Sequence, residues 1–186
     1  MSKILVIVGM AGAGKSSCVD YIVAKGIPKV YFGGVIVDET KRRFGEVTQE
    51  KERLVREELR AKEGKGAVAA RIIPQIKELL KTHDHVIADG LYSWTEYRIF
   101  KDTFGDDALV IAVTAPRVTR HARLLHRPVR PLTAEEAQTR DYAEIEFLEK
   151  GGPIANADYT INNDGSTEVL FKDLETVLQK AGFYST

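Results

Sequence analysis

A glycine-rich segment, Gly9-Met10-Ala11-Gly12-Ala13-Gly14-Lys15-Ser16, has the residue types and spacing of a phosphate-binding loop. Glycines allow successive backbone N–H groups to turn inward around phosphate oxygens, and a helix that begins at the loop adds the partial positive charge of its N-terminus. Lys15 is placed to reach the outer phosphates of a nucleoside triphosphate, and Ser16 to bind Mg²⁺. We therefore expect ATP and Mg²⁺ as cofactors, bound by Gly9, Ala11, Gly12, Ala13, Gly14, Lys15, Ser16 and Ser17.

Asp89 is the second candidate, because it ends an apolar run and is followed at once by Gly90. This position puts the carboxylate at the carboxyl edge of a sheet, where ligands bind in open α/β proteins. A carboxylate there can hold Mg²⁺ through water or accept a proton from an attacking hydroxyl group. We expect Asp89 to be both a catalytic and a metal-binding residue. The alternative, an aspartate that caps a helix or closes a turn, stays open.

Arginines accumulate in a segment interrupted by Pro128 and Pro131. Planar guanidinium groups can contact in pairs the oxygens over which a transferring phosphoryl group spreads its charge. Arg123 and Arg127 are four residues apart, so on a helix they project from one face. We expect both to stabilise the transferring group, with a solvated charged surface as the alternative. The arginines of the segment are Arg117, Arg120, Arg123, Arg127, Arg130 and Arg140.

The elements that must position these residues are strands alternating with helices. Apolar strand-like runs lie at residues 4–8, 29–32, 85–88, 109–113 and 159–161, and at least one helical segment separates each from the next. This alternation predicts a three-layer α/β/α fold with a five-stranded parallel sheet. The strand, the glycine loop and the helix with Val19, Ile22 and Val23 follow in the order that a phosphate-binding loop requires.

Two segments depart from regular alternation. Residues 33–82 contain charged helices interrupted by Gly45, by residues 64–66 and by Pro74, which predicts a helical insertion. Residues 116–152 contain the arginines and predict a mobile lid. A final helix from about residue 167 to 180 should close one face of the sheet. Without a repeat or a linker, residues 1–186 are expected to form a single domain.

Composition narrows the classes of partner and site. The 27 basic and 27 acidic residues balance, so no overall basic field favours nucleic acid or an anionic membrane. Cys18 is the single cysteine, which excludes a disulfide framework, and the histidines lack a plausible metal spacing. The first apolar run is too short to span a membrane. We expect a cytoplasmic enzyme with a small-molecule phosphoryl acceptor. The oligomeric state is open, a homodimer included.

Two other classes of nucleotide-binding protein fit the sequence poorly. A GTP-dependent switch protein should carry an Asn-Lys-x-Asp motif, which the chain lacks. Residues 102–105 match D-x-x-G, but they lie in a helix-to-turn segment instead of at a strand end. A transporter ATPase should carry Leu-Ser-Gly-Gly-Gln, which is also absent. A small-molecule kinase remains.

With these motifs in place, the chain resembles the adenylate-kinase-like superfamily of nucleoside and nucleotide kinases. Residues 157–166 look like the A-D-Y-x-I-x-N-x-G-S segment of dephospho-CoA kinases. Residues 86–96 and Arg140-Asp141-x-x-Glu144 are more similar to archaeal proteins described as adenylate-kinase-related or dephospho-CoA-kinase-like, and this is the closer resemblance. The resemblance implies a five-stranded parallel core, an acceptor-binding helical insertion before the third strand and a lid after the fourth.

The resemblance also implies roles for single residues. Arg123 would flank the adenine, Arg127 would contact the phosphates, and the loop from Asn163 to Gly165 would border the base. Such kinases usually carry an aspartate after the second strand, often with an arginine three residues later, to bind the acceptor. The matching positions here are Gly34 and Val37, so the acceptor site is altered. The candidates to replace them are Asp38, Arg42 and Arg140.

The sequence thus predicts an ATP- and Mg²⁺-dependent phosphotransferase that acts on a nucleotide, a nucleoside or a related small metabolite. Lys15 and Ser16 would organise the triphosphate and the metal, and Asp89 would assist the metal or the acceptor. A nucleotide-binding regulatory protein with little or no phosphoryl transfer is the alternative, because Gly34 and Val37 stand at the expected acceptor positions. The acceptor and the choice between ATP and GTP stay open.

Overall fold

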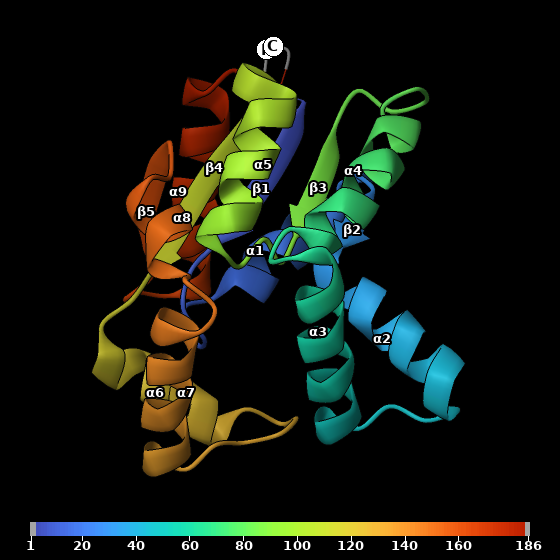
Figure 1. Cartoon of the computed structure of the whole chain (residues 1–186). Helices are drawn as coiled ribbons and strands as arrows, with labels where there is room; N and C mark the ends of the chain where they lie inside the picture. The colour runs from blue at the N-terminus through green and yellow to red at the C-terminus, as the bar shows by residue number, and fades with distance from the viewer. Residues whose placement is uncertain (1–2, 185–186) are drawn as a thin grey trace.

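Five parallel strands form one sheet in the order β2-β3-β1-β4-β5. The structure is a computed structural model that describes residues 3–184. The expected three-layer fold with a five-stranded parallel sheet is confirmed (Figure 1). Its strands are β1 (Ile4–Val8), β2 (Lys29–Tyr31), β3 (Val86–Asp89), β4 (Ala108–Thr114) and β5 (Tyr159–Asn162).

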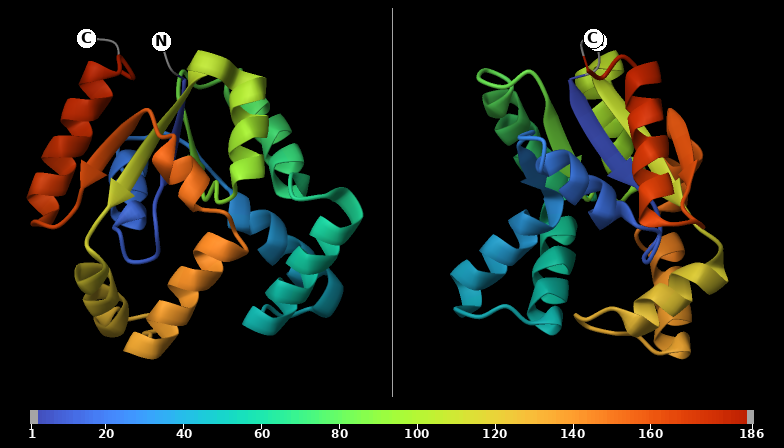
Figure 2. Two further views of the ribbon diagram at one scale, coloured as in Figure 1. Left: turned by 60° about the vertical axis from the view of Figure 1, so that its left-hand side comes forward. Right: turned by 180° about the vertical axis from the view of Figure 1, so that it is seen from behind.

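Helices cover both faces of the sheet, so its central strands are apolar along their length. Leu5 and Ile7 of β1 belong to one apolar cluster, which contains residues of α1 and α9. Ile4 and Val6 belong to a second cluster on the opposite face, with residues of α4 and α5 (Figure 2). The helices are α1 (Lys15–Val23), α2 (Phe32–Phe44), α3 (Gln49–Glu63), α4 (Ala67–Leu79), α5 (Trp94–Phe104), α6 (Arg117–His126), α7 (Ala134–Glu146), α8 (Gly151–Ala155) and α9 (Thr167–Lys180), with a 3₁₀ turn η1 (Gly105–Asp107).

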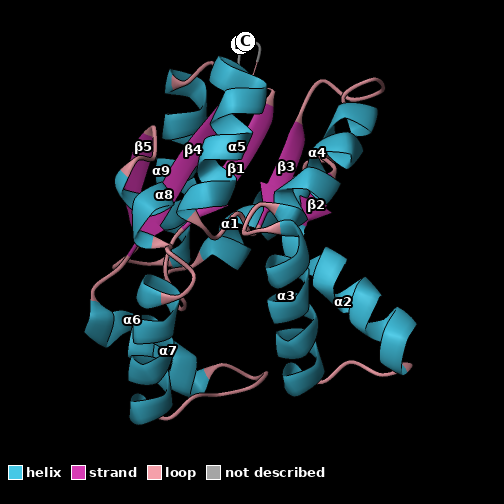
Figure 3. Cartoon of the chain, in the orientation of Figure 1, coloured by secondary structure: helices cyan, strands magenta, loops and turns pink. Residues whose placement is uncertain are grey.

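The register of the strands brings the candidate residues to one edge of the sheet. Ile7 of β1 is paired with Asp89 of β3 and with Ile111 of β4. The phosphate-binding loop follows β1, the insertion follows β2, and the lid follows β4. In Figure 3 the helices α2 and α3 on one side, and α6 and α7 on the other, extend beyond the carboxyl edge of the sheet. This edge is where a site can be built from all three segments.

The insertion consists of α2, α3 and α4. Gly45 ends α2 in the left-handed conformation, with φ of 72°, which a residue without Cβ adopts readily. The expected interruption at Pro74 is wrong, because α4 continues through this residue to Leu79. Ile72 and Ile76 are fully buried on either side of Pro74. Their packing offsets the cost of a proline inside a helix, about 3 kcal/mol.

Residues 116–152, the segment expected to form a lid and called the lid below, contain α6, α7 and the first two residues of α8. Helix α6 ends at His126, and Arg127 follows it with extended backbone angles (φ −68°, ψ 143°). The expectation that Arg123 and Arg127 project from one face of a helix is therefore wrong. The cause is Pro128, which disfavours helical angles at the preceding residue. Across residues 3–184, none of the helices combines the length and the hydrophobicity needed to cross a membrane.

Candidate active site

The phosphate-binding loop is held tightly by two other segments. Gly12 has φ of 77°, and a Cβ atom there would lie 2.6 Å from the carbonyl oxygen of Arg120 in α6. A Cβ atom at Gly14 would lie 2.2 Å from Nδ2 of Asn163. The same Nδ2 group donates a hydrogen bond of 2.8 Å to the carbonyl oxygen of Ala13. Only glycine fits these positions, so the predicted glycines serve the packing of the loop as well as its conformation.

Lys15 is partly buried at the start of α1 and donates a hydrogen bond of 2.9 Å from Nζ to the carbonyl oxygen of Met10. Burial lowers the pKa of Lys15 to about 8, and the positive charges of Lys150 and Arg140 act in the same direction. The carboxylates of Glu144 and Asp89 oppose this shift. A phosphate group next to Lys15 would favour the protonated ammonium, as a phosphate-binding lysine requires.

A carboxylate from the lid already contacts the loop. The backbone N–H of Ala11 donates a hydrogen bond of 2.9 Å to Oε2 of Glu144 in α7. The other oxygen of Glu144 accepts hydrogen bonds from Nζ of Lys150, at 2.7 Å, and from Nε of Arg140, at 3.2 Å. An anionic oxygen therefore fits at this amide, which supports the expectation that the loop binds an anion.

The carbonyl group of Ala11 is also held by the lid. Nη1 of Arg120 donates a hydrogen bond of 3.0 Å to it. Arg120 in turn makes two hydrogen bonds of 2.7 Å with the carboxylate of Asp141, which His121 contacts at 2.9 Å. Burial raises the pKa of Asp141, but the bonds from Arg120 and His121 outweigh it and keep this pKa below its usual value. Both polar backbone atoms of Ala11 thus depend on side chains of the lid.

Asp89 lies at the end of β3, where the sequence places it. Its carboxylate is 3.9 Å from Nζ of Lys29. Burial raises the pKa of Asp89, although the charges of Lys29 and Lys15 act against this shift. A raised pKa suits a carboxylate that accepts a proton. The described part of the chain contains no group of three or more His, Cys, Asp or Glu residues that could hold a metal ion. Ser16 and Asp89 stay predicted ligands of a Mg²⁺ ion whose other ligands would be phosphate oxygens and water.

A cavity of about 940 Å³ adjoins the loop and separates α3 from the lid. Its lining includes Lys15, Ser16 and Arg140, and it has eight basic side chains against four acidic ones. Arg60 is notable, because its buried Nε atom has no hydrogen-bond partner among residues 3–184. The charge of Arg60 also acts on the carboxylate of Glu96, so Nε is one unsatisfied donor of a guanidinium that has an acidic neighbour. The basic residues of this cavity are Lys15, Arg53, Arg56, Arg60, Arg127, Arg130, Arg140 and Lys150.

The residues expected near the adenine meet one another away from this cavity. Nη1 of Arg123 donates a hydrogen bond of 2.9 Å to the carbonyl oxygen of Asn163, whose side chain binds the loop. Gly165 follows in the exposed loop before α9. Arg127 lines the cavity, whereas Arg123 does not. The structure thus separates the two arginines, which remain predicted contacts of the base and of the phosphates.

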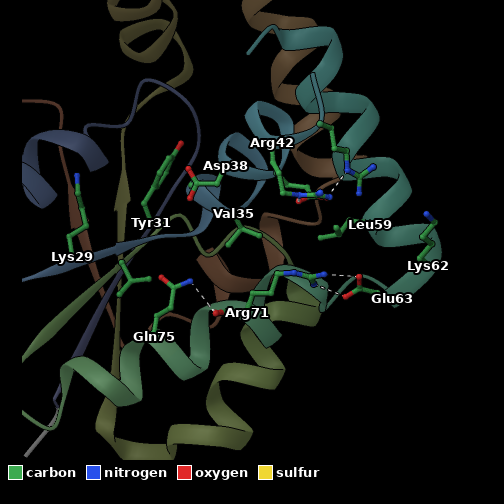
Figure 4. Close-up of a pocket in the computed structure, with 14 residues that line it drawn as sticks. Lys29, Tyr31, Val35, Asp38, Arg42, Leu59, Lys62, Glu63, Arg71 and Gln75 are labelled. Carbon is green, nitrogen blue, oxygen red and sulfur yellow. Dashed lines mark hydrogen bonds and ion pairs between the residues drawn. The ribbon is translucent and has the colours of Figure 1, made fainter. Parts of the chain in front are cut away.

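Two of the expected acceptor residues lie elsewhere. Asp38 and Arg42 line a separate hollow of about 820 Å³, which Figure 4 shows between α2, α3 and α4. Arg42 is engaged there by Glu39 through hydrogen bonds of 2.7 and 2.8 Å. Val37 faces the cavity beside the loop, whereas Gly34 lines the hollow of Figure 4. Of the three predicted acceptor residues, the structure brings only Arg140 to the phosphate-binding loop.

Sequence reasoning missed several residues that the structure brings to the loop. Glu144 belongs to the Arg140-Asp141-x-x-Glu144 motif, which was a usable signal because its spacing puts Arg140 and Glu144 on one helical face. Lys150 has no such signal. Arg56 and Arg60 lie in α3, whose many charged residues are typical of a solvent-exposed helix. The sequence therefore does not indicate that they line a cavity.

Comparison with known proteins agrees with this geometry. A family model described as an AAA domain matches residues 5–143. A shikimate kinase from Bacteroides thetaiotaomicron is similar in structure, with a TM-score of 0.58 over 95% of this chain and 98% of that chain. Their sequences are 16% identical, so the likeness concerns the fold, which is that of P-loop kinases.

Two archaeal relatives cover nearly the whole chain. A UPF0200/UPF0201 protein of Archaeoglobus fulgidus is 37% identical over 96% of this chain, which spans 55% of that protein's length. A UPF0200 protein of Thermococcus gammatolerans is 35% identical over 95% of this chain and 94% of its own length. A closer tie to adenylate or dephospho-CoA kinases stays a prediction. The match to the Thermococcus protein over nearly the full length of both chains shows that the chain belongs to the family of UPF0200 proteins.

Proposed function

We propose that this protein is an ATP- and Mg²⁺-dependent phosphotransferase that acts on a nucleotide, a nucleoside or a related small metabolite. The observation that carries the proposal is the phosphate-binding loop at the edge of an arginine-lined cavity of about 940 Å³. Phosphoryl transfer depends mainly on positioning and on stabilising negative charge. Lys15, the loop amides and the arginines from both sides of the cavity supply these two functions.

The nucleotide side of the site is formed by the loop and the lid. The backbone amides from Gly9 to Ser16 would hold the phosphates, with Lys15 on the outer ones. Ser16 would ligate Mg²⁺, with Asp89 as a ligand through water, and the bound metal supplies charge neutralisation for the transferring group. Arg127 would contact the same phosphates, while Arg123 and Asn163 would border the base.

The acceptor side is formed by α3. Arg56 and Arg60 line the cavity opposite Arg140 of the lid. Their planar guanidinium groups suit a carboxylate or phosphate group of the acceptor, and the unpartnered Nε of Arg60 supports this choice. Among the proposed acceptors, an anionic one is therefore favoured. Asp89 would accept the proton of the attacking hydroxyl group.

The test is ADP release from Mg·ATP against a panel of nucleoside monophosphates, nucleosides and dephospho-CoA, with a control that lacks acceptor. A lid that excludes water should keep hydrolysis slow until the correct acceptor is present. Stimulation by one compound supports a kinase and identifies its acceptor class. Fast hydrolysis that no acceptor changes would contradict the proposal.

Replacing Asp89 tests the chemical step. We expect Asp89→Asn to lower turnover about 10²- to 10⁴-fold, because a general base is lost, with little change in ATP affinity. Asp84→Asn is the matched control, since Asp84 is exposed just before the same strand and should leave turnover unchanged. Equal turnover of the two variants would remove Asp89 from the mechanism.

A nucleotide-binding regulatory protein is the second candidate. The observation that favours it is Val37, an uncharged residue that faces the cavity where related kinases carry a charged acceptor ligand. This candidate predicts tight ATP binding with negligible turnover for every acceptor. Isothermal titration with Mg·ATP, run beside the acceptor panel, separates the two functions.

A further inference from the structure

The contact between Glu144 and the phosphate-binding loop joins residues 133 positions apart in the chain. The Ala11 amide belongs to the glycine-rich loop, and its hydrogen bond of 2.9 Å goes to a carboxylate oxygen. Carboxylate and phosphate oxygens are equivalent acceptors for such an N–H group. A phosphate cannot take this hydrogen bond until Glu144 has moved away.

Glu144 lies among basic side chains. Nζ of Lys150 is 2.7 Å and Nε of Arg140 is 3.2 Å from the same carboxylate oxygen. Lys15 is the third cation, since Lys150 and Arg140 are the two positive charges that most lower its pKa. Glu144 is the carboxylate in direct contact with Lys150 and Arg140, while Asp89 also acts on Lys15 and Asp141 also acts on Lys150. A polyphosphate carries more negative charge and would neutralise these cations better.

Lys150 is well placed to exchange one anion for another. Its side chain is 7% exposed, and that of Glu144 is 4% exposed. A buried ammonium group that loses its partner is strongly unfavourable, so displacement of Glu144 requires a new anion near Lys150. Nζ of Lys150 also lies 4.6 Å from the ring centre of Tyr92, a contact that does not depend on Glu144. Tyr92 and Lys150 both line the cavity beside the loop.

We propose that Lys150 is a second phosphate-binding lysine, and that Glu144 is an internal anion which the nucleotide displaces from the Ala11 amide. This inference rests on the proposed binding of nucleotide at the loop. On displacement, Lys150 exchanges the carboxylate of Glu144 for a phosphate oxygen. Because Glu144 belongs to α7, its release also removes one of the contacts between the lid and the loop. Glu144 thereby weakens nucleotide binding, while Lys150 strengthens it.

The test measures Mg·ATP affinity of the full chain by isothermal titration for four proteins: wild type, E144Q, K150M and the double variant. E144Q removes the competing charge, so its affinity should rise about tenfold. K150M should then lower affinity about tenfold in the E144Q background, because a charged hydrogen bond to phosphate is lost. E146Q is the matched control, since Glu146 is an exposed residue of the same helix, and its affinity should equal that of wild type.

The E144Q background separates the two roles of Lys150. If Lys150 only neutralises Glu144, then K150M has no effect once Glu144 is uncharged, and the inference is overturned. Reduced affinity of E144Q would equally overturn the role of Glu144 as a competitor. K150R should restore affinity in the E144Q background, which covers the case that K150M folds poorly. Absence of ATP binding by wild type would instead contradict the proposed function itself.

Discussion

Ala11 is the residue on which the lid acts most directly. Its N–H group donates to Glu144 and its carbonyl group accepts from Arg120, and both partners come from helices of the lid. Gly12, the next residue, is in close contact with the backbone of α6. A change in the charge or position of the lid therefore acts on the loop directly, through these contacts of Ala11 and Gly12. The strands of the sheet need not move.

At the residue scale, the pKa of Lys15 leads to a prediction about protons. Burial lowers this pKa to about 8, so near pH 8 about half of the molecules lack the proton. Phosphate raises the pKa again, and nucleotide binding at pH 8 should take up about half a proton, falling toward zero at pH 6. Isothermal titration in buffers of different ionisation enthalpy measures this uptake.

The conservative variant Lys15→Arg provides the control. An arginine stays charged at every pH tested, so proton uptake at pH 8 should fall while nucleotide still binds. The affinity of the wild type for nucleotide should weaken as the pH rises above about 8, because the neutral amine of Lys15 then predominates. Unchanged uptake in Lys15→Arg would assign the titration to another group.

Sequence reasoning could place the residues that have a local signal, while their roles stay predictions. Lys15 and Ser16 are read from eight consecutive residues, and Asp89 from its place after an apolar run. Lys150 contacts Glu144 only because the chain turns between α7 and α8, and no local pattern encodes that approach. Asp38 and Arg42 had the expected residue types, yet they line a different hollow from the one beside the loop.

At the scale of elements, the strands and most helices were predictable because apolar runs and glycines mark their limits. The final helix begins and ends within the predicted residues, and Gly45 and Gly64 end α2 and α3. The local rule for proline failed at Pro74, where core packing keeps α4 helical. The same rule held at Pro128, since α6 ends at His126, and it was the expected continuation of the helix to Arg127 that was wrong.

The fit between the loop and α6 predicts an effect on stability. Gly12→Ala combines a positive φ with a Cβ atom 2.6 Å from a backbone oxygen. Gly45→Ala has a similar φ of 72° but meets no atom within 4 Å, so it isolates the strain of the backbone. We expect Gly45→Ala to lower the free energy of unfolding by about 1 kcal/mol and Gly12→Ala by about 3 kcal/mol. Urea unfolding measures the free energy of unfolding of both variants. Equal losses would mean that α6 shifts to make room for the Cβ atom of Gly12→Ala at little cost.

At the scale of the whole molecule, an even balance of charges conceals a strongly cationic cavity. The chain has 27 basic and 27 acidic residues, yet the cavity beside the loop has eight basic side chains against four acidic ones. These cations come from the loop, from α3 and from the lid, segments far apart in sequence. Folding concentrates the positive charge where a polyanion is expected, although the net charge remains zero.

The positive charge of the cavity predicts that the affinity for Mg·ATP depends on salt concentration. The net charge of the chain, which is zero, would predict no such dependence. Raising the ionic strength from about 0.05 M to about 0.5 M should weaken Mg·ATP binding about tenfold, because screening acts on the local field. Adenosine, which lacks phosphates, is the control and should bind with nearly constant affinity. Titration calorimetry at several salt concentrations compares the two ligands. A parallel decline for adenosine would point to a general effect of salt on the fold.

The separation of the apolar residues into clusters has a consequence for how such a protein diverges. One cluster joins one face of the sheet to α1 and α9, beneath the phosphate-binding loop. Another joins the opposite face to α2, α3 and α4, which carry the acceptor side of the cavity. A third, small cluster connects Ala11 to Leu124 and Ala137 of the lid. Under the proposed function, substitutions at the cavity-lining residues of α3 would change the acceptor that fits, while the cluster that joins α1 and α9 to the sheet would keep its packing. Descendants of one ancestor could then acquire new acceptors and keep the same phosphate donor.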